Sequence, residues 1–93
     1  MKWQFADPPN VAVFTSKNII NQTEWIQYVS HDEDDGAWQF HSAGGASDKD
    51  ISIVSLEEIT EMDPSVILLS DLPAGWFASR TTKEGAWKRE KKV

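Results

Sequence analysis

The chain has 93 residues, a formal net charge of −6 and no cysteine. A chain of this length forms one domain and buries on the order of two thirds of its unfolded surface, which is enough for a single core. The absence of cysteine excludes disulfides, thiolate zinc sites and cysteine nucleophiles. Net acidity argues against nucleic-acid binding, because a polyanion is bound by clustered cations.

Charge is unevenly placed along the chain. Residues 1–63 contain three Lys and twelve Asp or Glu, whereas residues 64–93 contain six Lys or Arg and three acids. The basic cluster Lys88–Lys92 is typical of a solvated terminus. The N-terminus lacks the apolar run of a signal peptide, and no segment approaches the roughly 20 apolar residues of a membrane span. We therefore expect a cytoplasmic protein that does not bind membranes.

The first elements follow a proline-rich lead-in at residues 1–10. Val11–Thr15 is β-branched and apolar, so it predicts a strand. Ser16 or Thr15 is placed to cap a short helical turn at Lys17–Ile20.

A β-hairpin is the clearest local pattern. Two β-prone runs flank the acidic segment 32–35, which ends in Asp35-Gly36, a dipeptide typical of hairpin turns. Either register of the hairpin makes Trp38 and Phe40 core residues. No register brings the two histidines, His31 and His41, together as metal ligands.

Two registers remain open. A two-residue turn at Asp35-Gly36 places His31 and His41 on opposite faces, with Trp25 and Val29 on the face of the core residues. A five-residue loop instead places Ile26 and Tyr28 on that face and turns Gln39 and His41 away from it.

The second half begins with an exposed loop at Ser42–Asp50 and a strand at Ile51–Val54. Ser55 and Glu58 form a capping box, which predicts a helix from Ser55 to Met62. Leu56, Ile59 and Met62 follow helical spacing and are expected to face the sheet.

Asp63-Pro64 ends the helix, because the residue before proline avoids the helical region. The apolar run Val66–Leu69 is compatible with a buried strand or a short helical turn. A turn at Asp71–Gly75 precedes strands at Trp76–Arg80 and Ala86–Glu90. We therefore predict one α+β domain over residues 1–93, with its core at about residues 11–90 and a basic tail at 91–93. Its architecture is a small, mostly antiparallel sheet with one main helix packed on one face.

Catalytic and metal motifs are missing from the sequence. Counted from Asp32, the twelfth position of an EF-hand is Ala43 rather than glutamate. No G-x-S-x-G or P-loop pattern occurs, so no cofactor, metal or catalytic residue is predicted. Most of the tryptophans are expected in the core. For Arg80 and Arg89 we expect cation-π stacking or pairing with the hairpin acids.

A likeness to known proteins is carried by the segments Asp34–Phe40, Val54–Ile59, Asp63–Val66, Asp71–Trp76 with Ala78 and Arg80, and Trp87 with Arg89. Together they resemble a family of small, single-domain bacterial proteins of unknown function. The likeness covers about residues 11–90, and a more distant one links the chain to immunity-protein-like domains of bacterial polymorphic toxin systems. In that pattern glycine and tryptophan are adjacent, whereas Ala37 separates them here.

The leading hypothesis is a non-enzymatic, acidic protein-interaction domain, similar to immunity proteins, that meets a basic protein or toxin. The expected partner-binding residues are Asp32, Glu33, Asp34 and Asp35. The alternative is a small ligand-binding protein or hydrolase whose tryptophan-lined pocket uses His31, His41 or the acids. Either a monomer or a homodimer fits the sequence, with an open sheet edge such as Trp76–Arg80 as the dimer contact.

Overall fold

The computed structural model describes residues 3–43 and 51–92. Most of the predicted loop Ser42–Asp50 lies outside the described residues, as does Val93. In chain order the elements are β1 (Ala12–Ser16), α1 (Lys17–Ile20), β2 (Tyr28–His31), β3 (Trp38–His41), β4 (Ile51–Ser55), α2 (Leu56–Met62), the 3₁₀ helix η1 (Pro64–Leu69), β5 (Trp76–Ser79) and β6 (Lys88–Lys91).

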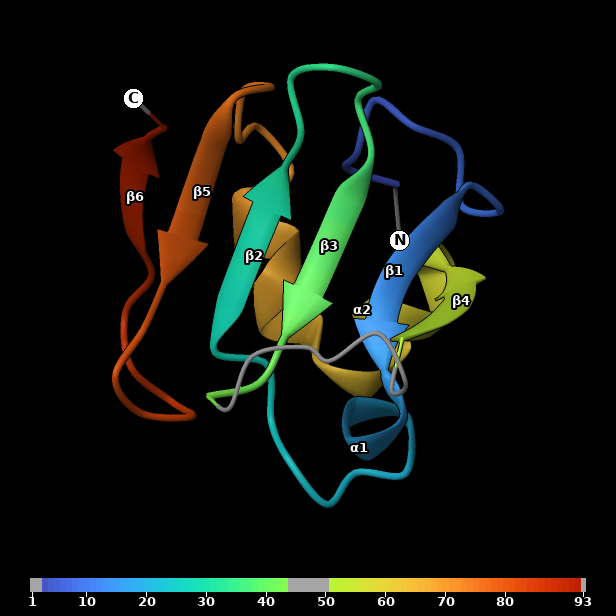
Figure 1. Cartoon of the computed structure of the whole chain (residues 1–93), viewed down its shortest axis with the longest axis vertical. Helices are drawn as coiled ribbons and strands as arrows, with labels where there is room; N and C mark the ends of the chain where they lie inside the picture. Colours follow the sequence, from blue (N-terminus) through green and yellow to red (C-terminus); the bar gives the residue numbers. More distant parts are fainter. Residues whose placement is uncertain (1–2, 44–50, 93) are drawn as a thin grey trace.

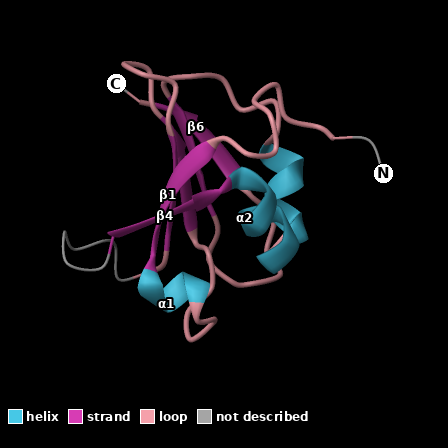
Figure 2. Ribbon diagram, turned by 90° about the vertical axis from the view of Figure 1, so that its right-hand side faces the viewer, coloured by secondary structure: helices cyan, strands magenta, loops and turns pink. Residues whose placement is uncertain are grey.

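The strands form one six-stranded sheet in the order β4-β1-β3-β2-β5-β6. All neighbours pair antiparallel except β1 and β3, which are parallel. Helix α2 and η1 lie behind the sheet in Figure 1, and Figure 2 shows α2 to one side of the sheet seen edge-on. The predicted α+β class, with a mostly antiparallel sheet and a helix packed on one face, is confirmed.

Capping residues begin both α-helices where the sequence predicts. Ser16 accepts a hydrogen bond from the Ile19 amide at 3.3 Å, so it is the cap of α1. Ser55 accepts from the Glu58 amide at 3.2 Å, and its hydroxyl also contacts the Glu58 carboxylate. The predicted N-cap role of Ser55 is therefore confirmed, and the Glu58 carboxylate accepts from the Ser55 hydroxyl.

The apolar run after Pro64 is helical rather than extended. Asp63 ends α2 and also begins η1, since its side chain accepts from the Ser65 amide at 3.1 Å. Pro64 suits the first helical turn because that position needs no amide donor. Val66 and Leu69 of η1 are buried in the core. The choice between strand and helical turn, which the sequence left open, is thus settled as a 3₁₀ helix.

Neither predicted hairpin register gives the observed pairs, but the two-residue turn assigned the faces correctly, with Val29 on the core face and His31 and His41 on opposite faces. Val29 pairs with Phe40 and His31 pairs with Trp38, so Tyr28 lies on the opposite face of the sheet from the core residues. The turn is a wider loop, in which the Gly36 amide donates to the Asp32 carbonyl at 3.0 Å. Gly36 has a φ of 72°, the left-handed conformation that glycine adopts without a steric penalty. Asp35-Gly36 therefore closes the loop instead of forming its two central residues.

The strand Trp76–Ser79 is not a sheet edge, which corrects the predicted dimer contact. It lies between β2 and β6, and the two edge strands are β4 and β6. The basic segment predicted to be a solvated terminus supplies β6, which extends to Lys91. The pairing of β6 with β5 continues beyond Lys91, because the Lys92 amide donates to the Gly75 carbonyl at 2.9 Å.

The core lies between the sheet and its helical cover. Trp38 and Phe40 are buried there, as predicted, together with Leu56 and Ile59 of α2. The lead-in segment also contributes, because Phe5 is buried and packs edge-on against Trp38 with ring centroids 5.3 Å apart. The remaining buried apolar residues are Val13, Ile19, Ile26, Val29, Val66, Leu69, Leu72 and Ala78.

Candidate functional site

The acidic turn, residues 32–35, joins β2 to β3 at one end of the sheet. Glu33, Asp34 and Asp35 are exposed, whereas Asp32 is half-buried. Asp35 supports the turn itself, because its carboxylate accepts from the Ala37 amide at 2.9 Å. Glu33 and Asp34 form no ion pair within the described residues, so their charges face solvent.

Asp32 differs from the other acids of the turn because its carboxylate bonds side chains outside the turn. Its Oδ2 accepts from Gln39 Nε2 at 2.6 Å, and its Oδ1 accepts from the Ser30 hydroxyl at 3.4 Å. Lys92 Nζ lies 3.5 Å from the same Oδ1. Of the four predicted partner-binding residues, Asp32 is therefore bonded to side chains of the sheet. Glu33, Asp34 and Asp35 remain accessible to a partner.

Both arginines are paired with acids outside the acidic turn. Arg80 pairs with Asp63, and Arg89 pairs with Asp71, each at 2.6 Å. Neither arginine reaches the acidic turn, so the expected pairing of arginines with the hairpin acids is wrong. The only described cation at the turn is Lys92, which the sequence analysis did not connect to it.

The face of the sheet opposite α2, here called the open face, carries no described helix (Figure 2). The pairing places Phe14 beside Ile53 on β4 and beside Gln39 on β3. Phe14 and Ile53 are exposed. On the other side of β3, Tyr28 stacks on Phe77 with ring centroids 5.4 Å apart. This open face thus combines apolar side chains with the polar groups of β2 and β3.

A chain of hydrogen bonds runs across the open face from Asp32 through Gln39 to His41. The Asp32 carboxylate accepts from the Gln39 amide nitrogen, which turns the amide oxygen toward His41. That oxygen lies 2.9 Å from Nε2 of His41. Because an amide oxygen only accepts, Nε2 carries the proton. The neutral ring therefore has its lone pair on Nδ1.

Nδ1 of His41 is buried and has no hydrogen-bond partner within the described part of the chain. Burial lowers the pKa of His41, the Asp32 charge opposes this shift, and the Lys92 charge adds to it. The net direction is downward, so the neutral imidazole is the favoured form near pH 7. An acceptor that is both buried and unpaired is uncommon in folded proteins.

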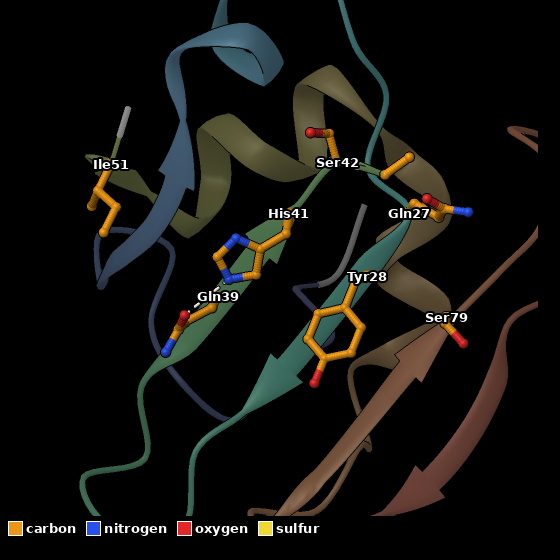
Figure 3. Close-up of a pocket in the computed structure, with 8 residues that line it drawn as sticks. Gln27, Tyr28, Gln39, His41, Ser42, Ile51 and Ser79 are labelled. Carbon is orange, nitrogen blue, oxygen red and sulfur yellow. Dashed lines mark hydrogen bonds between the residues drawn. The ribbon is translucent and has the colours of Figure 1, made fainter. Parts of the chain in front are cut away.

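His41 lines a hollow of about 570 Å³ at the end of the sheet opposite the acidic turn (Figure 3). Tyr28 and Gln39 form its floor with His41, and Ser42 and Ile51 stand beside the imidazole. None of the described lining residues is charged or a tryptophan. The hollow differs in this respect from the tryptophan-lined pocket of the alternative hypothesis. Sequence reasoning placed Gln39 and His41 on the same face, but it missed Tyr28 as the cross-strand neighbour of His41 because neither predicted register pairs these two residues.

His31 has a different environment on the covered face. Its ring stacks on Trp38 at a centroid distance of 4.0 Å. Nδ1 lies 2.8 Å from the carbonyl oxygen of Leu72, so it donates to that oxygen. His31 and His41 thus lie on opposite faces, and His31 ties β2 to the segment before β5.

Arg80 lies between two tryptophans on the covered side of the molecule. Its guanidinium carbon is 4.2 Å from the centroid of Trp87 and 5.5 Å from that of Trp25. The predicted cation-π contact of Arg80 is confirmed. Trp25 also lines a second cavity, of about 460 Å³, whose described lining contains no histidine. Trp3, Trp76 and Trp87 pack partly buried against the core, and only Trp38 is fully part of it.

Metal and membrane features were searched over residues 3–43 and 51–92. No group of three or more His, Asp or Glu is placed there to hold a metal ion. The helices in the same part of the chain are too short and too polar to span a bilayer.

Comparisons with protein-family models, with curated proteins and with solved structures find no match to this chain.

Proposed function

We propose that this chain is a non-enzymatic protein-interaction domain that binds a basic partner protein through the acidic turn. The observation that carries the proposal is the position of Glu33, Asp34 and Asp35, which are exposed together on one turn. Such a group of like charges lowers folding stability slightly through mutual repulsion, and a cationic partner relieves that repulsion.

The scaffold supports the turn as a preformed surface. Asp35 bonds the Ala37 amide, and the Gly36 amide bonds the Asp32 carbonyl, so the loop is fixed by its own hydrogen bonds. A fixed loop loses little conformational entropy on binding. The contact between Lys92 and Asp32 shows that this end of the sheet accommodates a lysine side chain.

Charge of this kind mainly accelerates association and selects the partner. A cationic protein of the class of bacterial toxins is one partner that the weaker resemblance to immunity-like domains implies. The proposal itself requires only a positively charged patch of matching size on the partner.

The experiment compares two variants with equal loss of charge. The turn variant carries Glu33→Gln, Asp34→Asn and Asp35→Asn, and it keeps Asp32 because that residue bonds Gln39. The control variant carries Glu57→Gln, Glu61→Gln and Glu84→Gln, which remove three exposed acids elsewhere. A Lys-rich peptide serves as the first probe, and a basic protein isolated on the immobilised chain serves as the second.

We expect the turn variant to associate with the basic protein about tenfold more slowly than the wild type at low ionic strength. The difference should shrink in about 0.5 M salt, where screening is strong. In the wild type, the peptide should shift the amide resonances of residues 33–36 more than those of α2. Equal association rates for the turn and control variants would refute the proposal.

A further inference from the structure

We propose that the second cavity, beside Trp25, binds an apolar side chain from a peptide segment of another protein, and that the side-chain amide of Gln22 bonds the adjoining peptide group. The cavity is lined by residues 19, 22–26 and 62–64 and by Lys83. Helix α1 and the loop that follows it lie at the end of the sheet opposite the acidic turn (Figure 1). Binding here is therefore independent of the proposed contact at the acidic turn.

Gln22 holds a backbone conformation that usually belongs to glycine. Its φ is 62°, and in the part of the chain that the structure describes it is the one residue other than glycine with a positive φ. The left-handed conformation is strained for a residue with a Cβ. Strained residues of this kind gather at functional sites, so the conformation of Gln22 motivates a search for a use of its side chain.

The end of α1 imposes this conformation on Gln22. The Gln22 amide donates to the Ile19 carbonyl, and the Thr23 amide donates to the Asn18 carbonyl, each at 3.0 Å. With Asn21 as the C-cap, these two bonds form a Schellman motif, in which the residue after the cap is left-handed and is usually glycine. Glycine would close the helix with less strain, so the backbone does not call for a glutamine at this position.

The side chain of Gln22 is exposed and lines the cavity. Its amide forms no hydrogen bond within the described residues, so no bond of the fold offsets the strain. Two acids of the lining already have partners, since Glu24 Oε1 accepts from Asn18 Nδ2 at 3.0 Å and Asp63 pairs with Arg80. The Gln22 amide is thus free to donate and to accept, which matches the N–H and C=O of a peptide group.

The apolar part of the lining suits a side chain next to that peptide group. Ile19 and Ile26 are buried, whereas Trp25 and Met62 are half-buried and keep part of their surface open. The guanidinium carbon of Arg80 lies 5.5 Å from the centroid of Trp25, so the ring already has a neighbour that positions it. The volume of about 460 Å³ is within the range of about 300–1,000 Å³ that is typical of ligand pockets.

N-acetyl-leucinamide tests the proposal on the full chain, because it carries an apolar side chain between two peptide groups. N-acetyl-glycinamide is the matched control without the side chain. The leucine compound should shift the side-chain amide resonances of Gln22 and the indole N–H of Trp25, and it should bind about tenfold more tightly than the glycine compound. The indole N–H of Trp38, which bonds Asp7, should not shift.

Two outcomes of this titration would overturn the proposal. One is the absence of a shift at the Gln22 side-chain amide with N-acetyl-leucinamide up to its solubility limit. The other is equal affinity for the leucine and glycine compounds. Both measurements use the wild-type chain, so neither depends on the folding of a variant.

Gln22→Gly separates the demands of the fold from those of binding. It removes the strain and the amide together, so the Tm should rise by about 4 °C while the affinity for N-acetyl-leucinamide falls about fivefold. Gln22→Asn keeps an amide on a residue that adopts the left-handed conformation more readily, so it should also raise the Tm and retain more of the affinity. A Gln22→Gly variant that binds as tightly as the wild type, or that is less stable than it, would refute the inference.

Discussion

Nη2 of Arg80 lies 2.6 Å from Oδ2 of Asp63, and this ion pair joins the end of β5 to the residue between α2 and η1. The Arg80 side chain is 1% exposed. Its Nε donates to the Ile26 carbonyl at 2.9 Å, and its Nη1 donates to the Ser65 hydroxyl at 2.8 Å. One guanidinium therefore connects three segments that are distant in sequence.

Replacing Arg80 should destabilise the fold strongly. Arg80→Ala leaves Asp63 and the Ile26 carbonyl without a buried partner, and we expect a loss of about 3 kcal/mol in the free energy of unfolding. Arg80→Lys should also be clearly destabilising, because an ammonium group does not reproduce the planar fork of donors. Urea denaturation followed by tryptophan fluorescence measures both losses.

The exposed pair between Arg89 and Asp71 is the control for this prediction. The Asp71 side chain is 77% exposed, and exposed ion pairs contribute little to stability. Arg89→Ala should therefore change the unfolding free energy much less than Arg80→Ala does. A loss for Arg80→Ala no larger than that for Arg89→Ala would contradict the structural role of Arg80.

Local signals in the sequence predicted much of the fold. Ser16 and Ser55 began helices as expected, and Pro64 marked the break after α2, because caps and prolines act through the adjacent backbone. Local sequence signals do not predict the order of the strands in the sheet. It depends on long-range pairings, such as the parallel contact of β1 with β3, which no local pattern specifies.

The register of the hairpin explains why the site at His41 was not predicted. Asp35-Gly36 suggested a two-residue turn, but Gly36 closes a wider loop through its bond to Asp32. The wider loop shifts the pairing by two positions from that of a two-residue turn, so every side chain stays on the same face. The shift places Tyr28 directly opposite His41, and the polar chain from Asp32 becomes visible only in three dimensions.

Acidification should destabilise the chain through His41. Burial lowers the pKa of its imidazole in the folded state, so the unfolded state binds more protons between the folded pKa and about 6.5. Stability is then fully present above about pH 6.5 and falls as the pH drops toward the folded pKa, by at most about 1.4 kcal/mol per pH unit for one proton. Thermal or urea unfolding between pH 7.5 and 5.0 measures this slope.

His41→Gln supplies the comparison for the pH experiment, since it removes the titrating group and keeps a polar side chain. The slope between pH 7.5 and 5.0 should be smaller in this variant than in the wild type. The pKa of Asp71 is also lowered, through its hydrogen bond from Arg89, but that carboxyl titrates below this window. An unchanged slope in His41→Gln would show that another group is responsible.

Gly36 should tolerate asparagine better than alanine. Its φ of 72° is unfavourable for residues with a Cβ, although the space around it is open. Gly36→Ala should cost about 1 kcal/mol of unfolding free energy through backbone strain alone. Gly36→Asn should cost less, because asparagine adopts the left-handed conformation more readily. Urea denaturation ranks the two variants, and equal costs would show that the turn rearranges.

The two edges of the sheet should differ in their tendency to self-associate. β6 carries Lys88, Arg89, Glu90 and Lys91, and charges of this kind prevent edge-to-edge pairing. The opposite edge, β4, has no charged residue, and Ile53 on it is 64% exposed. Ile53→Lys should therefore lower light scattering at high protein concentration and change the unfolding free energy by no more than about 0.5 kcal/mol. Lys88→Ile places an isoleucine on the charged edge as the converse control, and it should raise scattering. If Ile53→Lys scatters as much as the wild type, any self-association of the chain proceeds through a surface other than β4.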